Sequence, residues 1–572
     1  MKMHDETGGA ASHPVLFLMD ADQNARVLTE SALVRRFGSD YRVLAISKPR
    51  EGLDVLEGLA DQGDDVALVA ADLHLPGMDG VQFLERAHAL HPGCCRVLLV
   101  ALDDYHTRVP FTELPTLQRA TALGRIDFWL MKGWVSPEEW IYPQLQEALT
   151  EWTIANRPRF VVYRIVGERW APRSHELRDM LTRNGVPFQF YPADSEQGRQ
   201  LIRGLEIDVR RLPAAIRHDG SVLHDPSFAD IAVAHGISTR PSPELYDLAI
   251  VGAGPAGLTA AVYGASEGLR TVVVEPEAIG GQAGTSSMIR NYLGFPRGIS
   301  GGALAHRAWE QALFFGAEFV FARGARGLEP RGDERVVTLT DGIELRARAV
   351  IIASGVSYRR LGVPTLDRLI GAGVFYGSPG VEAPAMAGLE VYVVGGANSA
   401  GQAAIHLARF AARVGLLVRG ESLSASMSDY LIRQLEATPN IDVRLHTQVV
   451  DGLGDARLEG LTVEDLRTGL RDTVAAAGVF VLIGAEPRTE WLRDVLRLGD
   501  GGILTGRDVP AEAWSLRRSP LPFETSLPGV FAAGDVRYGS VKRVAAAVGE
   551  ASVTVGSAHQ YLSGLEAKAP LV

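Results

Sequence analysis

A glycine-rich motif in the second half of the chain has the form that binds the pyrophosphate of a dinucleotide. It reads Gly252-Ala-Gly254-Pro255-Ala256-Gly257 and lies between an apolar strand and a small-residue helix, predicted at Leu248–Val251 and Leu258–Gly268. The first glycine permits a tight turn, the second lets backbone approach phosphate, and the third allows close helix–strand packing. The helix N-terminus presents free N–H groups to the phosphates. A second strand ends at Glu275, whose carboxylate suits a ribose diol.

A second motif of this type follows a predicted strand at Val391–Val394. It comprises Gly395, Gly396, Ala397, Asn398, Ser399 and Ala400, ahead of a helix at Gly401–Ala412. Ala397 stands where the phosphate-approach glycine belongs. The next strand ends at Arg419, and a cation there favours a 2′-phosphate, hence NADPH over NADH. The alternative is a nucleotide-type domain retained only for packing.

A third motif, Val530-Phe-Ala-Ala-Gly534-Asp535, joins a strand to a carboxylate placed for a ligand hydroxyl. The run Lys542-Arg543-Val544 is predicted to begin a helix that ends near Leu562. The N-terminus of that helix could stabilise negative charge on a bound ring system.

Cysteine usage excludes several classes of site. The chain has two cysteines, and these are adjacent, Cys94 and Cys95. It therefore has no C-x-x-C dithiol and is neither a disulfide-stapled secreted protein nor a Cys-rich metal module. We expect no redox role for the two thiols. His74, His88, His91 and His106 lack metal-ligand spacing, so no metal site is predicted.

Length and charge limit the remaining classes. With 572 residues the chain is expected to form three or four domains. Its net charge of −11 opposes nucleic-acid binding. No apolar run approaches the ~18 residues of a membrane span, and the polar start, Met1–Ala11, is not a signal peptide. We expect a cytoplasmic protein with neither nucleic-acid nor membrane partners.

Alternating strand and helix patterns predict an α/β protein with parallel sheets. The predicted segments are 1–155, 156–240, 241–365, 366–489 and 490–572.

The part from Tyr246 onward resembles the low-molecular-weight thioredoxin reductases. The resemblance rests on the three motifs above and on Gly280-Gly281-Gln282, Ile289-Arg-Asn291-Tyr-Leu-Gly294, Ala353-Ser-Gly355 and Ile483-Gly484. It implies FAD and NADPH as cofactors and a homodimer. It also implies that FAD contacts the first and third motifs, Glu275, Gly281, Gln282, Asn291, Ala353, Gly355 and Lys542–Val544, with Gly484 as a further cofactor-binding position.

The dithiol of that family is missing. It should lie within Val374–Glu382, at Gly377–Gly380 or Ser378–Val381, where no residue is a cysteine. Serine and glycine cannot replace thiolate attack and mixed-disulfide formation. The family's arginine cluster for the 2′-phosphate is also incomplete. Arg419 matches one member, but Gly420 and Ser424 stand where further arginines are expected.

The first segment resembles a response-regulator receiver. Asp72 matches the phosphoacceptor and Lys132 the active-site lysine, whereas Ala21 replaces one acid beside Asp20 and Val100 replaces a hydroxyl residue. A vestigial phosphorylation site is therefore expected.

The second segment resembles a glutaredoxin-like fold through Ser174–Phe190 and Leu212-Pro213, without cysteine at Arg169–Arg173. Together the first segment, the second segment and the part from Tyr246 onward resemble the fused response regulator/thioredoxin-disulfide reductase family. The resemblances imply a receiver-like, flavodoxin-like domain at 1–155 and a thioredoxin- or glutaredoxin-like domain at 156–240. They also imply an FAD-binding domain in two parts, at 241–365 and 490–572, with an NAD(P)H-binding domain at 366–489 between them.

Three functions remain open. The first is an FAD-dependent oxidoreductase passing electrons from NADPH to an unidentified non-thiol acceptor, either a small molecule or a protein. The second is a non-catalytic flavin-binding regulatory or scaffold protein. The third is a thioredoxin-disulfide reductase that uses Cys94 and Cys95 or a partner's thiols. No catalytic side chain is assigned on the chain itself, since hydride transfer needs orientation more than acid–base groups.

Overall fold

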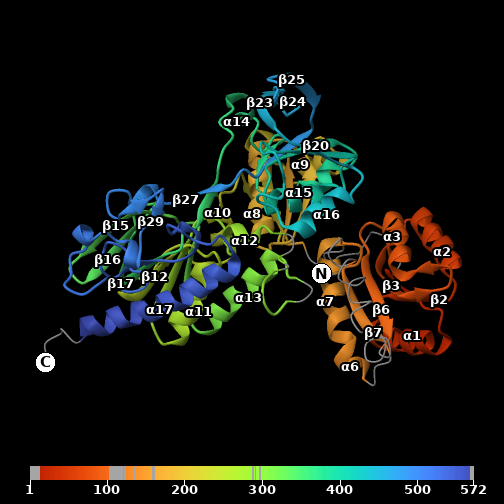
Figure 1. The fold of residues 1–572 in the computed structure, drawn as a ribbon, viewed down its shortest axis with the longest axis horizontal. Coiled ribbons are helices and arrows are strands. Elements are labelled where there is room, and N and C mark those ends of the chain that lie inside the picture. Colours follow the sequence, from red (N-terminus) through yellow and green to blue (C-terminus); the bar gives the residue numbers. More distant parts are fainter. Residues whose placement is uncertain are drawn as a thin grey trace. The chain divides into compact units, whose positions relative to one another are not determined.

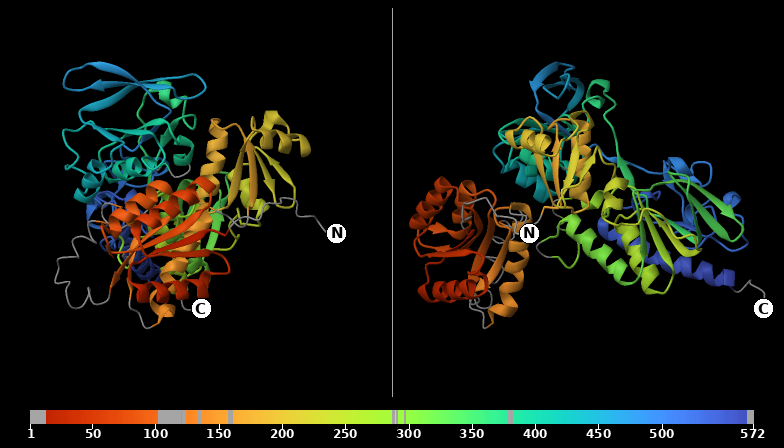
Figure 2. Two further views of the ribbon diagram at one scale, coloured as in Figure 1. Left: turned by 90° about the vertical axis from the view of Figure 1, so that its right-hand side faces the viewer. Right: turned by 180° about the vertical axis from the view of Figure 1, so that it is seen from behind.

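The computed structural model (Figures 1 and 2) describes residues 13–101, 120, 124–132, 136–156, 161–286, 289, 291–295, 298–377, 379 and 382–566. Met1–Ala11, His106 and, from the two dithiol registers, Ser378, Gly380 and Val381 lie outside these residues. The chain divides into two units, one of Met1–Phe160 with Ser428–Pro439 and one of Val161–Met427 with Asn440–Val572. In the described part, no helix is long and apolar enough to cross a membrane.

The first unit contains a five-stranded parallel sheet in the order β2-β1-β3-β6-β7. Its strands are β1 (Val15–Met19), β2 (Arg42–Ile46), β3 (Val66–Asp72), β6 (Cys95–Ala101) and β7 (Phe128–Lys132). Its helices are α1 (Gln23–Phe37), α2 (Pro49–Gln62), α3 (Gly80–Leu90), α6 (Pro137–Trp140), α7 (Tyr142–Asn156) and, from the second sequence stretch, α16 (Asp429–Glu436). This strand order is the doubly wound flavodoxin-like order.

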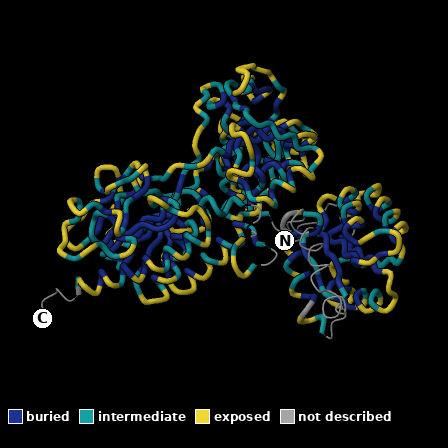
Figure 3. Tube along the Cα trace, in the orientation of Figure 1, coloured by how far each residue is buried: buried dark blue, intermediate teal, exposed yellow. Residues whose placement is uncertain are grey.

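The two faces of this sheet are covered by different helices. Leu56 and Phe83, from α2 and α3, are buried in one cluster, and Leu33 and Leu149, from α1 and α7, in the other. Figure 3 shows the buried strands enclosed by more exposed helices. Because both faces are covered, the strands are nearly continuous apolar runs, the pattern from which they were predicted.

The second unit begins with a four-stranded mixed sheet in the order β11-β10-β8-β9. Its strands are β8 (Tyr163–Gly167), β9 (Phe188–Pro192), β10 (Ala214–Arg217) and β11 (Val222–His224), and its helices are α8 (Pro172–Arg183), α9 (Glu196–Gly204) and α10 (Phe228–Ala234). The Leu212–Pro213 peptide bond is cis.

A seven-stranded sheet follows, which with its helices we call the first dinucleotide half. Its order is β14-β13-β12-β17-β16-β15, with β30 beside β17. The strands are β12 (Tyr246–Val251), β13 (Thr271–Glu275), β14 (Glu318–Phe321), β15 (Ala325–Arg331), β16 (Glu334–Leu339), β17 (Glu344–Ile352) and β30 (Val530–Ala532). The helices are α11 (Pro255–Ser266), α12 (Gly281–Gly284), α13 (Gly301–Phe314) and α17 (Val544–Glu566).

The second dinucleotide half is inserted between β17 and β30. Its parallel sheet has the order β19-β26-β20-β21-β22 and is accompanied by an antiparallel β23-β24-β25 sheet. The elements are α14 (Pro364–Asp367), β19 (Val374–Tyr376), β20 (Glu390–Val394), α15 (Asn398–Leu407), β21 (Arg413–Leu417), β22 (Ile441–Arg444), β23 (Thr447–Leu453), β24 (Gly460–Asp465), β25 (Arg471–Ala475) and β26 (Gly478–Val481). An antiparallel pair, β18 (Val356–Tyr358) and β27 (Ala485–Pro487), carries the chain into and out of this half.

Helix starts differ from the expected ones by a few residues. Helix α11 begins at Pro255, three residues before the predicted start, because proline is favoured in the first turn of a helix. Helix α15 likewise begins at Asn398, and α17 begins at Val544 instead of Lys542. The glycine motifs therefore lie directly at helix N-termini.

Candidate functional site

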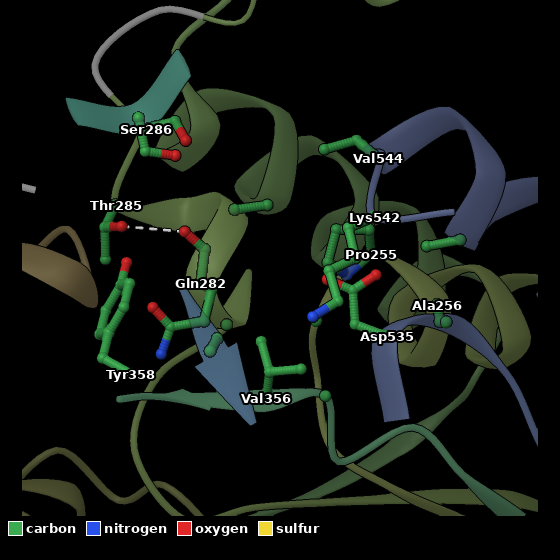
Figure 4. A pocket seen from close by; sticks show the side chains of 18 of the residues that line it. Pro255, Ala256, Gln282, Thr285, Ser286, Val356, Tyr358, Asp535, Lys542 and Val544 are labelled. Carbon is green, nitrogen blue, oxygen red and sulfur yellow. Dashed lines mark hydrogen bonds between the residues drawn. The ribbon is translucent and has the colours of Figure 1, made fainter. Parts of the chain in front are cut away.

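A cavity of about 410 Å³ lies within the second unit and receives residues from both dinucleotide halves. Figure 4 shows Gln282, Thr285 and Tyr358 on one side of it and Asp535 and Lys542 on the other. The predicted site residues that line it are Gly252, Gly254, Pro255, Ala256, Glu275, Gly281, Gln282, Ala353, Gly355, Ser399, Gly484, Gly534, Asp535, Lys542, Arg543 and Val544.

The glycines of the first motif have the geometry that their predicted roles require. Gly252 has φ +106°, and a Cβ there would lie 2.4 Å from the carbonyl oxygen of Ala353. A Cβ at Gly257 would lie 1.8 Å from the carbonyl oxygen of Gly252, so helix and strand pack at van der Waals limits. At Gly254 no atom lies within 4 Å of such a Cβ. The space above Gly254 is open to the cavity and fits a pyrophosphate at the start of α11.

Glu275 is held in place by backbone N–H groups. Its Oε2 accepts from Ala253 at 2.7 Å, and its Oε1 accepts from Glu277 and Ala278 at 2.9 and 3.1 Å. Burial raises the pKa of Glu275, opposed by the bond from the Ala253 N–H. Each carboxylate oxygen can accept more than one hydrogen bond, so the side chain still suits ribose hydroxyls.

The third motif forms the opposite wall. Gly534 has φ +77° and donates its N–H to Glu550 of α17 at 2.8 Å. Burial raises the pKa of the next residue, Asp535, and the Lys542 ammonium opposes that rise. Val544, where α17 begins, also lines the cavity, so the start of a 23-residue helix is directed at any ligand bound there.

The second motif contributes one face of α15 to the same cavity. Ser399, Gln402, Ala403 and His406 line it. Gly395 has φ +147°, and a Cβ there would lie 2.3 Å from the carbonyl oxygen of Leu482. The helix begins after Ala397 without a side-chain cap.

Seven predicted site residues lie outside the cavity lining. They are Gly257, Asn291, Gly395, Gly396, Asn398, Ala400 and Arg419. Gly257 and Gly395 act through backbone packing, as their close approaches show. Arg419 is exposed after β21 and, among the described residues, makes no hydrogen bond or ion pair. A free guanidinium at that strand end suits a phosphate at the edge of the second half.

Several lining residues were not predicted from the sequence. Tyr358 is close to Thr285, and burial raises its pKa. The Thr285 hydroxyl donates to the Gln282 carbonyl at 2.8 Å (Figure 4). Arg183, Glu277 and Arg488 also line the cavity, although they lie far apart in sequence. None of these residues belongs to one of the three sequence motifs. Only the polar residues shortly after Gln282 could have indicated from the sequence that this part of the chain lines a site.

The stretch expected to hold a dithiol passes beside Tyr358. Gly377, which follows β19, has φ +107°, and a Cβ there would lie 2.7 Å from the Tyr358 ring. Any larger residue at this position would have to displace that ring. The chain's own thiols are in the first unit, where Cys94 is buried and Cys95 begins β6. Burial, together with the nearby Asp127 carboxylate, raises the pKa of the Cys94 thiol to about 12.

A charged cluster lies at the carboxyl ends of the first unit's strands. The Lys132 Nζ is 2.5 Å from Asp72 Oδ2 and 3.2 Å from Asp20 Oδ2. Burial raises the pKa of Asp20, opposed by Lys132, whereas carboxylate contacts raise the pKa of Lys132 despite burial. Asp22 caps α1, accepting from the Asn24 and Ala25 N–H groups, and so does not replace the missing acid.

Comparison with known proteins places this site in a family. The model of the pyridine nucleotide-disulphide oxidoreductases matches residues 246–551. A thioredoxin reductase of Peptoclostridium acidaminophilum is 32% identical over 324 residues, which are 56% of this chain and 97% of that protein. A 34.2 kDa protein in the rubredoxin operon of Clostridium pasteurianum is 32% identical over 318 residues, 56% of this chain and 97% of that protein.

Solved structures give the same assignment. Thioredoxin reductase from Lactococcus lactis matches with a TM-score of 0.51 at 26% identity, covering 56% of this chain and 99% of that one. Thioredoxin reductase from T. acidophilum matches with a TM-score of 0.50 at 27% identity, over 56% and 99% of the two chains.

The chain belongs to the pyridine nucleotide-disulphide oxidoreductase family, with thioredoxin reductases among its relatives. It is an FAD- and NAD(P)H-dependent oxidoreductase, and FAD and NADPH are the cofactors of thioredoxin reductases.

Proposed function

We propose that this protein oxidises NADPH through FAD and passes the electrons to an acceptor that is not a disulfide. The observation that carries the proposal is that the first and third motifs line the same cavity as helix α15 of the second dinucleotide half. A flavin held by the first half and a nicotinamide held by the second would therefore share one enclosure. Flavin supplies hydride acceptance and onward one- or two-electron transfer when bound.

In this scheme the chain's own residues bind the two cofactors, orient them and exclude water from the space between them. The open backbone at Gly254 and the fixed Glu275 carboxylate suit the pyrophosphate and ribose of FAD. Exposed Arg419 suits the 2′-phosphate of NADPH. Buried apolar residues such as Val356 and Ala403 border the region between the two sites and reduce access of water.

The lack of cysteine among the residues that line the cavity supports a non-thiol acceptor. Both cysteines are in the first unit and neither lines the cavity. A quinone, a ferredoxin-like protein, oxygen or a small metabolite can accept electrons from reduced flavin without thiolate chemistry. The relatives that bear the name thioredoxin reductase are therefore a guide to the cofactors more than to the acceptor.

An anaerobic titration tests the proposal. We expect purified full-length protein to show flavin absorption that NADPH bleaches, and to reduce a quinone but not an aromatic disulfide reagent. Absence of bleaching at millimolar NADPH would contradict electron entry. Disulfide reduction as fast as quinone reduction would contradict the acceptor class.

A non-catalytic regulatory role is a second candidate, favoured by Ala397 in the second motif. It predicts FAD co-purification with slow or absent reduction by NADPH. The same titration separates the two candidates, because a scaffold retains the flavin spectrum at every NADPH concentration.

We further propose that the first unit is receiver-like and that the segment 161–240 is thioredoxin-like. The flavodoxin-like strand order with Asp20, Asp72 and Lys132 at one edge supports the first assignment. The four-stranded sheet with a cis bond before Pro213 supports the second.

A homodimer is proposed through the groove between α11 and α13. Leu293 and Phe314 are 93% and 84% exposed, and Tyr292, Phe295 and Phe315 line a neighbouring cavity. Apolar surface of this kind on one face typically marks a protein interface. Sedimentation of wild type against a Phe314→Glu variant tests it, and a wild-type monomer at micromolar concentration would contradict it.

A further inference from the structure

Helix α8 belongs to neither dinucleotide half, yet it contacts both. Its residues His175, Asp179 and Arg183 recur every four positions and so lie along one helix face. The two ends of this face are separated by about 12 Å along the axis, at about 1.5 Å per residue. The contacts at the two ends involve different halves of the oxidoreductase.

At its C-terminal end, α8 binds the first dinucleotide half. Arg183 Nη1 lies 3.1 Å from Glu277 Oε2, and the Asn184 side-chain amide donates to the Glu277 carbonyl at 3.2 Å. Glu277 Oε1 also pairs with Arg488 at 2.8 Å, directly after the connecting strand β27. Burial alone would raise the pKa of Glu277, but Arg488 and Arg183 outweigh it and hold that pKa below its usual value.

At its N-terminal end, α8 contacts the second dinucleotide half. His175 Nδ1 lies 2.8 Å from Glu382 Oε1 as an ion pair, and among the described residues neither atom makes a hydrogen bond. The His175 ring also packs on Phe375 at 5.1 Å between centroids. Gly371, with φ +81°, lies so close to the start of α8 that a Cβ added to it would be 2.9 Å from Pro172 Cα. Glu382 is only 5% exposed, which shows how closed this contact is.

The covalent connection between the halves is slender by comparison. The chain passes between them through β18 and β27, a two-stranded pair that would be only marginally stable alone. A pair of this kind can act as a hinge. Helix α8 contacts the chain on both sides of this pair, at Glu277 and at Glu382.

We propose that α8 is a clamp that fixes the second dinucleotide half against the first, with His175 and Arg183 as positioning residues. The fixed arrangement is the one in which α15 and the first motif line one cavity. An effect of the clamp on hydride transfer rests on the proposed function. The clamp itself concerns only the position of one dinucleotide half relative to the other.

Spin-label distance measurements on the full-length chain test the clamp directly. Labels at Asp333→Cys and Leu470→Cys, both exposed, report on the first and second halves in a Cys94→Ser/Cys95→Ser background. We expect a narrow distance distribution that broadens or shifts in a His175→Ala/Arg183→Ala variant. Glu176→Ala is the matched control, because Glu176 lies on α8 but pairs with Arg173 of its own segment.

The second readout is the rate of flavin reduction by NADPH at constant FAD content. The clamp variant should be slower by roughly tenfold or more, since a misplacement of about 1 Å can cost on the order of 10²-fold. His175→Asn and Arg183→Lys remove less of the side chain than alanine does, and they should give intermediate distributions if the double variant does not fold.

Each outcome decides one question. A distribution equally narrow in the clamp and control variants would overturn the clamp. A wild type that NADPH does not reduce would overturn the proposed function, while the label distances would still decide on the clamp. Equal broadening in Glu176→Ala would also overturn it, because the effect would then come from α8 in general and not from its two contacts.

Discussion

The Glu275 carboxylate accepts a 2.7 Å hydrogen bond from the backbone N–H of Ala253, between the first two glycines of the first motif. The acid at the end of β13 and the loop at the end of β12 are thus connected before any ligand binds. A preorganised site loses less entropy when a ligand binds than one that must form on binding. This connection gives a physical reason for the glycine loop and the acid to occur together in the first motif.

Replacing Glu275 by alanine should therefore weaken FAD binding. The change removes an acceptor for ribose hydroxyls and leaves the N–H groups of Ala253, Glu277 and Ala278 without their partner. Hydrogen bonds to a charged group are worth about 1.5–3 kcal/mol, which corresponds to roughly 10- to 150-fold in affinity. Flavin fluorescence released on dilution measures the change.

The matched control is Glu344→Ala, in the same half. Glu344 is an exposed carboxylate paired with Arg331 and does not line the cavity. It should retain FAD like wild type. Equal FAD retention in both variants would contradict a role for Glu275 in binding.

Removing the Arg419 side chain should lower the preference for NADPH over NADH. The exposed guanidinium has no partner among the described residues and follows β21, where a 2′-phosphate would lie. In Arg419→Ala we expect kcat/KM for NADPH to fall about tenfold, the effect of losing one exposed charged contact, with little change for NADH.

The control is Arg413→Ala, because Arg413 is an exposed arginine at the start of β21 whose guanidinium already pairs with Asp442 at 2.9 Å. The interpretation of Arg419 would be wrong if Arg419→Ala lowered kcat/KM for NADPH and for NADH in equal proportion.

Local spacing in the sequence was enough to group some of the residues that line the cavity. Gly252, Gly254 and Glu275 were predicted together because strand, turn, helix and acid follow one another within about 30 residues, and all three line the cavity. Strands that are buried on both faces could also be predicted from the sequence, since they are continuous apolar runs.

Residues brought together by tertiary contact gave no such signal. Arg183, Glu277 and Arg488 line one cavity although they come from three separate parts of the chain. Asn291 was inferred from resemblance and lies outside the lining. The helix starts differed for a local reason: proline at the first turn and asparagine after Ala397 extend the helices toward the glycines.

Acidification should destabilise the second unit through His406. Burial, together with Arg409, lowers the pKa of His406 to about 4, whereas in the unfolded chain it is about 6.5. Between these values the unfolded chain binds a proton that the folded chain does not, so the free energy of unfolding falls as pH falls below 6.5. Above neutral pH, His406 contributes no pH dependence.

Thermal unfolding at about pH 5 and pH 7.5 measures this slope. The His406→Gln variant should lose less stability on acidification than wild type. His306→Gln is the control, since that side chain is 55% exposed. A slope unchanged by His406→Gln would show that other groups account for the acid loss.

Replacing both cysteines should leave electron transfer from NADPH unchanged. Cys94 is 4% exposed and its thiol pKa is raised to about 12, so little thiolate forms at neutral pH. The Cys94→Ser/Cys95→Ser variant should reduce a quinone at the wild-type rate. Selective loss of disulfide reduction in this variant would instead assign the chain's own thiols a redox role.

Removing Lys132 should destabilise the first unit, because it leaves two buried carboxylates uncompensated. Asp20 and Asp72 side chains are 0% and 8% exposed, and Lys132 Nζ lies within 3.2 Å of both. Breaking a buried ion pair from one side typically costs about 3–5 kcal/mol. Urea unfolding followed by tryptophan fluorescence should therefore show a lower midpoint for Lys132→Met.

A second substitution separates charge from packing. In Lys132→Met/Asp72→Asn one of the two carboxylates is neutral, so part of the lost stability should return. The exposed pair of Arg42 and Asp64 in the same unit is the control, and Arg42→Ala should cost at most about 1 kcal/mol. If Lys132→Met were no more destabilising than Arg42→Ala, the three charges would not form the coupled cluster that their distances indicate.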